Sequence, residues 1–231
     1  MFKTVSIEGN IASGKTTLLT ELKEHYKNND SIIFLKEPVD EWEKITDNSG
    51  NTMLQKFYAN QEKYSFSFQM MAYISRLSII RNAIKEKSKS GKPFVVITER
   101  CLLTDKHIFA KMLYDQNKIE EVNYKIYLNW FNEFANDFPI NNIIYVNTDP
   151  EICYIRLYKR ARQGEEIIPL SYLQSCHEYH EEYVKNSVIK DKLLLDGNKD
   201  IYEDTHILIN WINQIDNIIN NYLSDKKSTE I

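Results

Sequence analysis

The chain has 231 residues, of which 42% are hydrophobic and 27% are charged, and its formal net charge is −4. These proportions suit one or two globular domains and exclude a disordered or collagen-like chain. The acidic balance argues against a surface built to neutralise nucleic-acid phosphates, so we expect no nucleic-acid partner. Since the chain has only 6 glycines, two glycines within one short loop indicate a specific use.

Short apolar runs typical of strands alternate with longer segments of helical periodicity. The predicted strands are Phe2–Glu8, Ser31–Leu35, Phe94–Thr98, Asn142–Val146 and Leu193–Leu195. The predicted helices include Lys15–Tyr26, Gln61–Glu86, Val122–Phe134 and Ile201–Tyr222. Strands separated by helices imply parallel pairing, with crossover helices on both faces of the sheet. The pattern predicts one α/β domain over residues 1–223, a polar tail over residues 224–231, and ligands at the carboxyl ends of the strands.

Three cysteines, Cys101, Cys153 and Cys176, stand far apart in the chain. They form neither a C-x-x-C pair nor a zinc-ligand pattern, which indicates reduced thiols in a cytoplasmic protein. We expect Cys153 and Cys176 to be small buried core residues. No stretch approaches the length of a membrane span, so no membrane association is expected, and the early first strand leaves no room for a signal peptide.

The segment Gly9-Asn10-Ile11-Ala12-Ser13-Gly14-Lys15-Thr16 fits the pattern G-x-x-x-x-G-K-[ST], between a predicted strand and a predicted helix. In such a loop, backbone N–H groups surround a phosphate, and the helix N-terminus favours its negative charge. Lys15 would reach the outer phosphates, and the hydroxyl group of Thr16 would bind Mg²⁺. The loop predicts a nucleoside triphosphate site and leaves the reaction open.

Other nucleotide-binding classes need features that this chain lacks. The third strand is followed by Glu99 rather than by a Walker-B aspartate, and no lysine follows Asn147 to make a guanine-reading loop. These differences favour a small-molecule kinase over a GTPase or a motor ATPase.

Two carboxylates follow predicted strands, Glu37 after the second and Glu99 after the third. In a doubly wound sheet both positions lie beside the phosphate loop. A phosphoryl acceptor needs one carboxylate to orient its hydroxyl group and take the proton, and a second can hold Mg²⁺. Arg100 can pair with a carboxylate and with the transferring phosphoryl group. Taken singly, each of these residues also suits a surface charge or a helix cap.

A basic segment, formed by Arg156, Arg160 and Arg162, precedes a polar stretch that contains Gly164. Residues four apart share a helix face, so Arg156 and Arg160 should point the same way. Closure of such a segment over a triphosphate would exclude water and stabilise charge on the transferring group. A solvated basic face near a helix C-terminus fits the spacing equally well.

Five motifs occur in an order shared with one enzyme family. They are GNIASGKTT at residues 9–17, Glu37-Pro38-Val39 with Trp42, YSFSFQ at 64–69, Glu99-Arg100-Cys101 with Asp105, and RLYKRARQGEE followed by IPLSYL at 156–173. Together they resemble the deoxyribonucleoside kinases, which include deoxycytidine, deoxyguanosine and insect multisubstrate kinases and the mitochondrial-type thymidine kinase. The resemblance implies a P-loop kinase fold, with a five-stranded parallel sheet flanked by helices and an arginine-rich lid at about 156–168.

The resemblance also implies a reaction, in which the γ-phosphoryl group of ATP passes to the 5′-hydroxyl of a deoxyribonucleoside. Mg²⁺ would be the cofactor, and the protein would be a homodimer. Glu37 corresponds to the carboxylate that accepts the hydroxyl proton, Glu99 to an acidic residue associated with Mg²⁺, and Arg100 to the arginine beside the 5′-oxygen. Either Glu37 or Glu99 can be the base on this comparison, and we favour Glu37.

Further site residues follow from the resemblance by position. For ATP they are loop residues 9–17, which include Thr17, the lid arginines Arg156, Arg160 and Arg162, and Asp196 near the adenine. For the nucleoside they are Tyr58 and Glu165 at the sugar 3′-hydroxyl, Gln69 at the base, and the aromatic walls Trp42, Phe68 and Phe109. Cys101 replaces the usual serine, and the early lid glycine leaves the separate roles of Glu165 and Glu166 open.

Arg76 and Asp105 bear on base specificity. In the resembling family these positions are arginine and aspartate in deoxycytidine and deoxyguanosine kinases, and apolar in relatives that accept thymidine. A buried carboxylate needs a donor, which the exocyclic amines of cytosine and adenine supply and thymine lacks. Arginine can donate to a ring nitrogen or to guanine O6. We therefore expect purine and/or cytidine deoxynucleosides to be substrates, with room for a purine beside Ala72, and thymidine to be poor. A purely structural Arg76–Asp105 ion pair is the alternative.

Other functions remain open from the sequence alone. A kinase of broad specificity would accept thymidine as well. A nucleoside monophosphate kinase would need basic groups for the acceptor phosphate, where Glu37 stands. A non-catalytic ATP-binding module would be expected to lack Lys15, Glu37 or Arg100, and the chain has all three.

Overall fold

The computed structural model describes residues 2–160, 162, 164, 165 and 167–224. Glu166 of the predicted lid and residues 225–231 of the predicted tail lie outside the described residues. Ser224, which the sequence pattern placed in the tail, is the last residue of a helix. Within the described ranges, no helix combines the length and the apolar character needed to cross a membrane.

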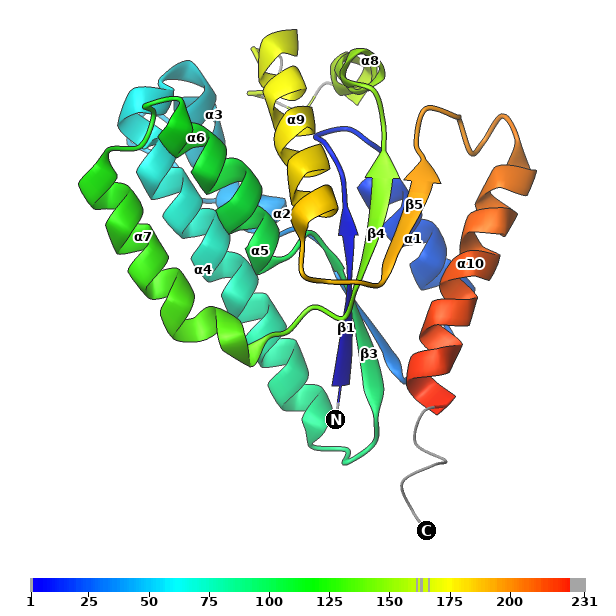
Figure 1. Cartoon of the computed structure of the whole chain (residues 1–231). Helices are drawn as coiled ribbons and strands as arrows, with labels where there is room; N and C mark the ends of the chain where they lie inside the picture. The colour runs from blue at the N-terminus through cyan, green and yellow to red at the C-terminus, as the bar shows by residue number, and fades with distance from the viewer. Residues whose placement is uncertain (1, 161, 163, 166, 225–231) are drawn as a thin grey trace.

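Five strands form one parallel sheet in the order β2-β3-β1-β4-β5 (Figure 1). They are β1 (Phe2–Glu8), β2 (Ile32–Leu35), β3 (Phe94–Glu99), β4 (Asn142–Asn147) and β5 (Lys192–Asp196). The predicted five-stranded parallel sheet is thus confirmed. The inner strand β3 is buried at every residue, as expected for the interior of a sheet covered on both faces, whereas the edge strands β2 and β5 are only partly buried.

Helices connect the strands and cover the sheet. They are α1 (Lys15–His25), α2 (Val39–Trp42), α3 (Met53–Ala59), α4 (Gln61–Ser88), α5 (Leu102–Thr104), the π-helix η1 (Asp105–Ala110), α6 (Lys111–Asp115), α7 (Glu121–Phe134), the 3₁₀ turn η2 (Ala135–Asp137), α8 (Pro150–Arg160), α9 (Leu170–Asn186) and α10 (Thr205–Ser224). The sequence pattern starts the last helix at Ile201, but α10 begins four residues later. There the side chain of Asp204 accepts a hydrogen bond from the backbone N–H of His206, as a helix cap does.

The helices form layers on both faces of the sheet. On one face α1 and α10 pack against β1, β3 and β4, with Trp211, Ile215 and Ile219 of α10 spaced four residues apart along its buried side. On the other face, Ile108 of η1 and residues of α9 pack against β4. The long helix α4 stands beside them and carries α7 on its outer side (Figure 1). This arrangement leaves the carboxyl ends of the strands free for ligands.

Gly9 makes the tight turn from β1 into the phosphate loop. Its φ angle is +147°, and a Cβ atom there would lie 2.6 Å from the carbonyl oxygen of Val146 and 2.6 Å from Oγ of Ser13. Because one of these neighbours is backbone in the central sheet, it cannot move aside cheaply. Only glycine fits where the loop approaches β4 so closely.

We expect Gly9→Ala to lower the free energy of unfolding by about 2–4 kcal/mol, because overpacking adds to backbone strain. Gly91→Ala is the matched control, since its φ is +67° and nothing lies within 4 Å of the new Cβ. It should lose only about 1 kcal/mol, from the left-handed backbone alone. Urea unfolding followed by circular dichroism measures both values, and equal losses would contradict the close-approach argument.

Candidate active site

One cavity of about 570 Å³ opens at the carboxyl ends of the strands. It is lined by most of the site residues predicted from the sequence: Ile11, Ala12, Ser13, Gly14, Lys15, Thr16, Thr17, Glu37, Trp42, Tyr58, Phe68, Gln69, Arg76, Glu99, Arg100, Asp105, Phe109, Arg156, Arg160, Arg162 and Glu165. Gly9, Asn10 and Asp196 are not among its lining residues. The tertiary structure thus brings the phosphate loop, both strand-end carboxylates and the aromatic residues around a single space.

The phosphate loop is held by buried polar contacts. Nζ of Lys15 donates to the carbonyl oxygen of Asn10 at 2.6 Å, and Lys15 is only 4% exposed. Burial, with the charge of Arg100 as a second cause, lowers the pKa of Lys15 to about 8. The side chain of Asn10 donates to the carbonyl oxygen of Leu173 at 2.8 Å and accepts from the N–H of Ile11. Asn10 therefore shapes the loop and ties it to α9, whereas the residues after it face the cavity.

Glu99, the last residue of β3, lies beside the phosphate loop. The hydroxyl group of Thr16 donates to its Oε1 at 2.5 Å. Its Oε2 is buried and has no hydrogen-bond partner among the described residues. A carboxylate oxygen without a partner and a neighbouring hydroxyl are hard oxygen ligands, which suit Mg²⁺. The residues at this position therefore fit the metal that the resemblance implies.

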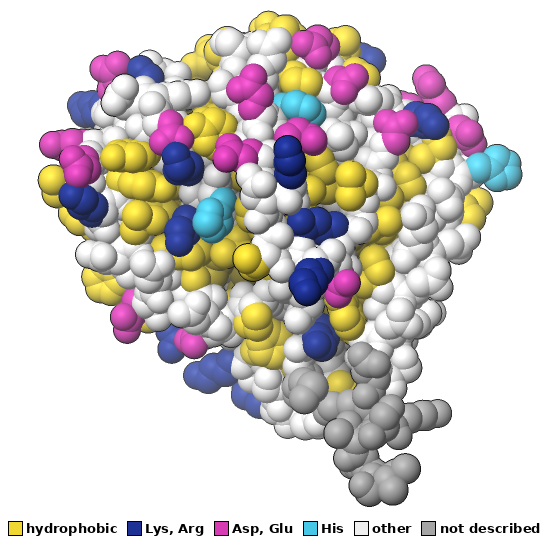
Figure 2. Space-filling view, viewed as in Figure 1, with side chains coloured by type: hydrophobic (Ala, Val, Ile, Leu, Met, Phe, Trp, Pro, Cys, Tyr) yellow, Lys and Arg dark blue, Asp and Glu magenta, His cyan; other side chains and the backbone are white. Residues whose placement is uncertain are grey.

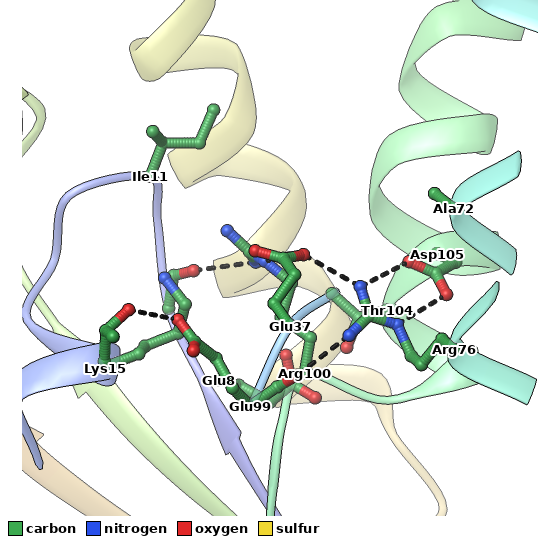
Figure 3. Close-up of polar contacts among 12 residues, drawn as sticks. Glu8, Ile11, Lys15, Glu37, Ala72, Arg76, Glu99, Arg100, Thr104 and Asp105 are labelled. Carbon is green, nitrogen blue, oxygen red and sulfur yellow. Dashed lines mark hydrogen bonds and ion pairs between the residues drawn. The ribbon is translucent and has the colours of Figure 1, made fainter. Parts of the chain in front are cut away.

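Arg76, on α4, connects both sides of the acceptor region (Figure 3). Its Nη2 donates to Oε1 of Glu37 at 2.8 Å, and its Nε donates to Oδ2 of Asp105 at 2.9 Å. A third nitrogen, Nη1, donates to the carbonyl oxygen of Glu99 at 2.8 Å. Asp105 is the first residue of the π-helix η1, which had no signal in the sequence. An ion pair between Arg76 and Asp105, which the sequence analysis gave as the alternative to base reading, is present, and both residues line the cavity.

The two carboxylates bound to Arg76 differ in their pKa values. Burial by itself raises the pKa of Glu37, but the charges of Arg100 and Arg76 outweigh it and bring the pKa to about 2. Burial raises the pKa of Asp105 to about 6, and the charge of Arg76 opposes that rise only in part. At neutral pH Glu37 is therefore fully ionised, whereas Asp105 titrates just below neutrality.

Arg100 follows β3 in a backbone conformation that a side chain rarely adopts, with φ of 62°. Its Nε lies 3.4 Å from Oε1 of Glu37, and its Nη1 donates to the carbonyl oxygen of Gly9 at 2.9 Å. The guanidinium group also lies over the ring of Phe109, at 4.7 Å from the ring centre. These contacts place a positive charge between the phosphate loop and Glu37.

Aromatic side chains wall the deeper part of the cavity. Phe68 stacks on Phe57 with ring centres 4.4 Å apart, and Trp42 meets Phe68 edge to face. Tyr58 stands at right angles to Tyr172, and burial followed by the charge of Glu165 raises its pKa well above the usual value. Phe57 and Tyr172 were not predicted from the sequence. Tyr172 falls within the IPLSYL motif, which was the signal available for it, whereas Phe57 belongs to none of the five motifs.

Gln69 offers a polar group at the wall of this aromatic region. It is 2% exposed, and its Oε1 is buried without a hydrogen-bond partner among the described residues. An unsatisfied buried amide oxygen is costly, so it favours a ligand that can donate a hydrogen bond to it.

The three arginines of the predicted lid have different partners. Nη1 of Arg156 donates to the carbonyl oxygen of Gly197 at 2.8 Å, on the loop after β5. Arg160 and Arg162 both pair with Glu165, which is only 4% exposed. Arg156 and Arg160 both belong to α8, as the sequence pattern expected, but they bind different partners. All three arginines nevertheless line the cavity.

Asp196 is not among the residues that line the cavity. Its carboxylate accepts a hydrogen bond from the backbone N–H of Asn198 at 3.2 Å and lies 3.7 Å from Nζ of Lys199. The residues that follow it line the cavity instead, namely Gly197, Lys199, Asp200, Ile201 and Tyr202. Asp196 therefore belongs to a turn whose following residues line the cavity, and its place near the adenine stays a prediction.

The three cysteines are buried and free, which confirms the prediction for Cys153 and Cys176. Cys101, the departure from the family pattern, has its Sγ 3.3 Å from Oγ1 of Thr104. Its pKa is raised, mainly by burial, so the thiol is neutral and acts as a small packed side chain.

Comparisons with known proteins agree with this site. Residues 5–220 match the family model for deoxynucleoside kinases. The chain is 34% identical to deoxycytidine kinase of Bos taurus over 229 residues, which cover 88% of this chain and 86% of that protein. It is 32% identical to deoxycytidine kinase of Homo sapiens over 237 residues, with 92% and 90% covered. It is also 32% identical to mitochondrial deoxyguanosine kinase of Xenopus laevis over 196 residues, with 79% and 73% covered.

The family match spans nearly all of the sheet, the phosphate loop and the residues around the cavity. Together with the parallel five-stranded sheet and its phosphate loop, it identifies the chain as a member of the deoxynucleoside kinase family, which are phosphotransferases of nucleoside salvage.

Proposed function

We propose that the protein transfers the γ-phosphoryl group of ATP to the 5′-hydroxyl of a purine and/or cytidine deoxynucleoside. The observation that carries this proposal is the position of Glu37 in the cavity, between the phosphate loop and the aromatic region. A triphosphate on the loop and a nucleoside between the aromatic walls would meet at this carboxylate. We propose that residues 1–223 work as one catalytic domain.

Glu37 is the group that receives the acceptor hydroxyl. Its pKa of about 2 keeps it ionised at neutral pH, so it is always able to accept the hydrogen bond of a 5′-hydroxyl. A carboxylate with so low a pKa is a weak base, and its main contribution is to orient the oxygen for attack. That suits phosphoryl transfer, in which the loose transition state needs little proton removal before the P–O bond forms. The proton ends on Glu37 as the phosphoester bond is completed.

Cationic groups stabilise the charge on the transferring phosphoryl group. Lys15 lies at the phosphate loop, and Arg100 lies between that loop and Glu37. Arg160 and Arg162 belong to the lid, which we propose to close over the triphosphate and exclude water. Thr16 and Glu99 would hold Mg²⁺, which when bound neutralises charge on the phosphate oxygens.

The geometry favours Glu37 over Glu99 as the base. Glu99 accepts the hydroxyl hydrogen bond of Thr16, the predicted metal ligand of the phosphate loop. Glu37 faces Arg76 and Arg100, on the side of the cavity that holds the aromatic walls. We therefore assign Glu99 to the metal and Glu37 to the acceptor hydroxyl.

Glu37→Gln should lower kcat by about 100-fold or more with Mg-ATP and deoxycytidine, because the neutral amide orients the hydroxyl group less firmly and cannot take the proton. Glu99→Gln should instead raise the Mg²⁺ concentration needed for half-maximal rate, with partial recovery of kcat at high Mg²⁺. Glu41→Gln is the control for the loss of a negative charge, because the side chain of Glu41 is 63% exposed. It should change neither kcat nor the Mg²⁺ concentration needed for half-maximal rate. A coupled assay of ADP release measures all three.

The opposite pattern would exchange the two roles. If Glu99→Gln lost kcat at every Mg²⁺ concentration while Glu37→Gln kept it, Glu99 would be the base. No phosphorylation of any deoxynucleoside by the unaltered protein would contradict the proposed function itself.

Asp105, Arg76 and Gln69 are proposed to read the base. Each oxygen of Asp105 accepts one hydrogen bond from Arg76, at 2.9 and 3.3 Å, which leaves a lone pair on each for a ligand donor. An exocyclic amine of cytosine or adenine supplies that donor, and thymine offers only an oxygen and a methyl group there. The similarity to deoxycytidine and deoxyguanosine kinases supports this choice.

We expect kcat/KM with deoxyadenosine, deoxycytidine or deoxyguanosine to exceed that with thymidine by about tenfold or more, since thymine offers no donor to the lone pairs of Asp105 that Arg76 leaves free. With deoxycytidine, kcat/KM should fall as the pH decreases through about 6, because Asp105 becomes protonated below its pKa and loses its acceptor. The protonation of Glu37 should not contribute to this fall near pH 6, because its pKa is about 2. Initial rates with each nucleoside between pH 5 and pH 8 measure both effects.

Asp105→Asn is the control for the pH dependence. It should remove the decline near pH 6 and bring the rates with deoxycytidine and thymidine closer together. Thymidine as the best substrate of the unaltered protein would overturn the base-reading role and favour a kinase of broad specificity, while leaving the kinase function intact.

A homodimer is proposed through α7 and the neighbouring part of α4. Val122, Ile126 and Trp130 follow one another at four-residue intervals on α7 and are 60%, 39% and 51% exposed. Ile74 of α4 is also 51% exposed. Hydrophobic side chains are frequent over the flank of the molecule that carries α7 (Figure 2). A stripe of this kind suits burial against a second copy of the chain.

Analytical ultracentrifugation of the unaltered protein should give a dimer at micromolar concentration, and Trp130→Glu should shift it to a monomer, because a charge would be buried within the interface. Tyr202→Glu, on a residue that is 66% exposed on the loop after β5, is the matched control and should leave the dimer intact. A monomeric unaltered protein would contradict the proposal.

We also propose a cytoplasmic location, which the three buried free thiols support because disulfides are rare in reducing compartments.

A further inference from the structure

His180 is a buried ionisable group for which the proposed reaction has no role yet. It lies on α9, is 0% exposed and does not line the cavity. Its ring packs between Tyr145 of β4, with which it is nearly parallel, and Phe109, which it meets edge to face. The same Phe109 ring carries the guanidinium group of Arg100 on its face. His180 therefore lies next to Arg100, outside the residues that line the cavity.

The hydrogen bonds of His180 determine which of its nitrogens carries the proton. Its Nδ1 lies 2.6 Å from the carbonyl oxygen of Cys176, and its Nε2 lies 3.2 Å from Nη1 of Arg100. A carbonyl oxygen only accepts and a guanidinium nitrogen only donates. Both bonds form together only if the hydrogen is on Nδ1 and Nε2 is bare. The imidazole is therefore neutral, in a single tautomer, and accepts a hydrogen bond from Arg100.

Protonation of this imidazole would disrupt the arrangement. A hydrogen on Nε2 would point at Arg100, and Lys15 adds positive charge near the ring. Burial and the charge of Arg100 lower the pKa of His180 well below its usual value, in agreement with this geometry. The ring is thus a neutral acceptor at neutral pH.

Arg100 needs such an acceptor because its backbone is strained and its side chain has few anchors. Nη1 has two acceptors, the carbonyl oxygen of Gly9 and Nε2 of His180, and Nε lies near Glu37. No acceptor for Nη2 occurs in the part of the chain that the structure describes. With Nη1 fixed by two acceptors, the planar group cannot rotate, and its Nη2 edge stays available for a ligand.

We propose that His180 is a positioning residue, whose neutral imidazole holds the guanidinium group of Arg100 in the orientation that serves phosphoryl transfer. The proposal rests on the role of Arg100 in the proposed function. His180 contacts neither substrate and acts only through Arg100. Its loss would let the guanidinium group rotate and would reduce kcat more than it weakens binding of either substrate, because the interaction is strongest in the transition state.

Two amide variants separate the two hydrogen bonds of the ring. The amide oxygen of His180→Gln can reach the position of Nε2 and accept from Arg100. The shorter side chain of His180→Asn reaches only the position of Nδ1, where it can donate to the carbonyl oxygen of Cys176. We expect kcat to fall about 10- to 100-fold in His180→Asn and to stay within about threefold in His180→Gln, with both KM values changed less than kcat. Equal losses of kcat in the two variants would overturn the proposal.

A double-mutant cycle tests whether the effect passes through Arg100. Arg100→Lys should lower kcat about 100-fold, because lysine keeps the charge and loses the planar group. Adding His180→Asn to Arg100→Lys should then cost less than about twofold more, since residues that act as a unit are not additive. A further loss equal to that of His180→Asn alone would mean that His180 matters for packing and not for Arg100.

The outcomes also separate this inference from the proposed function. If Arg100→Lys keeps full kcat, the role of Arg100 in the proposed function fails. If Arg100→Lys loses kcat and His180→Asn does not, only the role of His180 fails. His177→Asn, on the same helix and without a contact to Arg100, is the matched control and should keep kcat within about twofold. Thermal unfolding of each variant shows that the compared proteins are folded.

Discussion

The site depends on the buried guanidinium group of Arg76. It reaches from α4 to the ends of two strands, where it binds Glu37, the carbonyl oxygen of Glu99 and both oxygens of Asp105. Its side chain is 5% exposed, so these contacts are made with little help from water. Removing one partner of a buried ion pair lowers the stability of the fold by about 3–5 kcal/mol. Here the loss of Arg76 would leave two carboxylates, Glu37 and Asp105, without their cationic partner. The acceptor half of the cavity therefore exists in this shape because one planar cation satisfies three groups at once.

Arg76 contacts two carboxylates whose pKa values differ, Glu37 and Asp105. Glu37 receives positive charge from Arg76 and Arg100 and stays ionised, which suits a group that orients a hydroxyl. Asp105 receives it from Arg76, is more deeply buried at 3% against 19% exposure, and keeps a raised pKa. Two carboxylates with different pKa values, set by their surroundings, can do different chemistry in one cavity. The guanidinium group of Arg100 is also held by hydrogen bonds, since its Nη1 donates both to the carbonyl oxygen of Gly9 and to Nε2 of the neutral His180.

Local patterns in the sequence predicted much of this protein. The apolar runs gave all five strands, and the spacing of Gly9, Gly14 and Lys15 gave the phosphate loop, because these depend on neighbouring residues. The different partners of Arg156 and Arg160 could not be predicted, because helix periodicity fixes the face on which a side chain stands and not the acceptor it finds. Phe57 could not be recognised either, since its stacking on Phe68 joins two different helices.

By itself, then, the sequence determined the α/β fold, the phosphate loop, the family and the set of charged residues around the site. The tertiary structure alone decided that Arg76 joins Glu37 to Asp105, that Glu99 faces Thr16, that Asp196 caps its turn, and that His180 supports Arg100. The physical reason is distance along the chain: Arg76 and Glu37 are 39 residues apart, and His180 and Arg100 are 80 apart. Pairings between such remote groups are set by the packing of helices on the sheet, which no short-range pattern encodes.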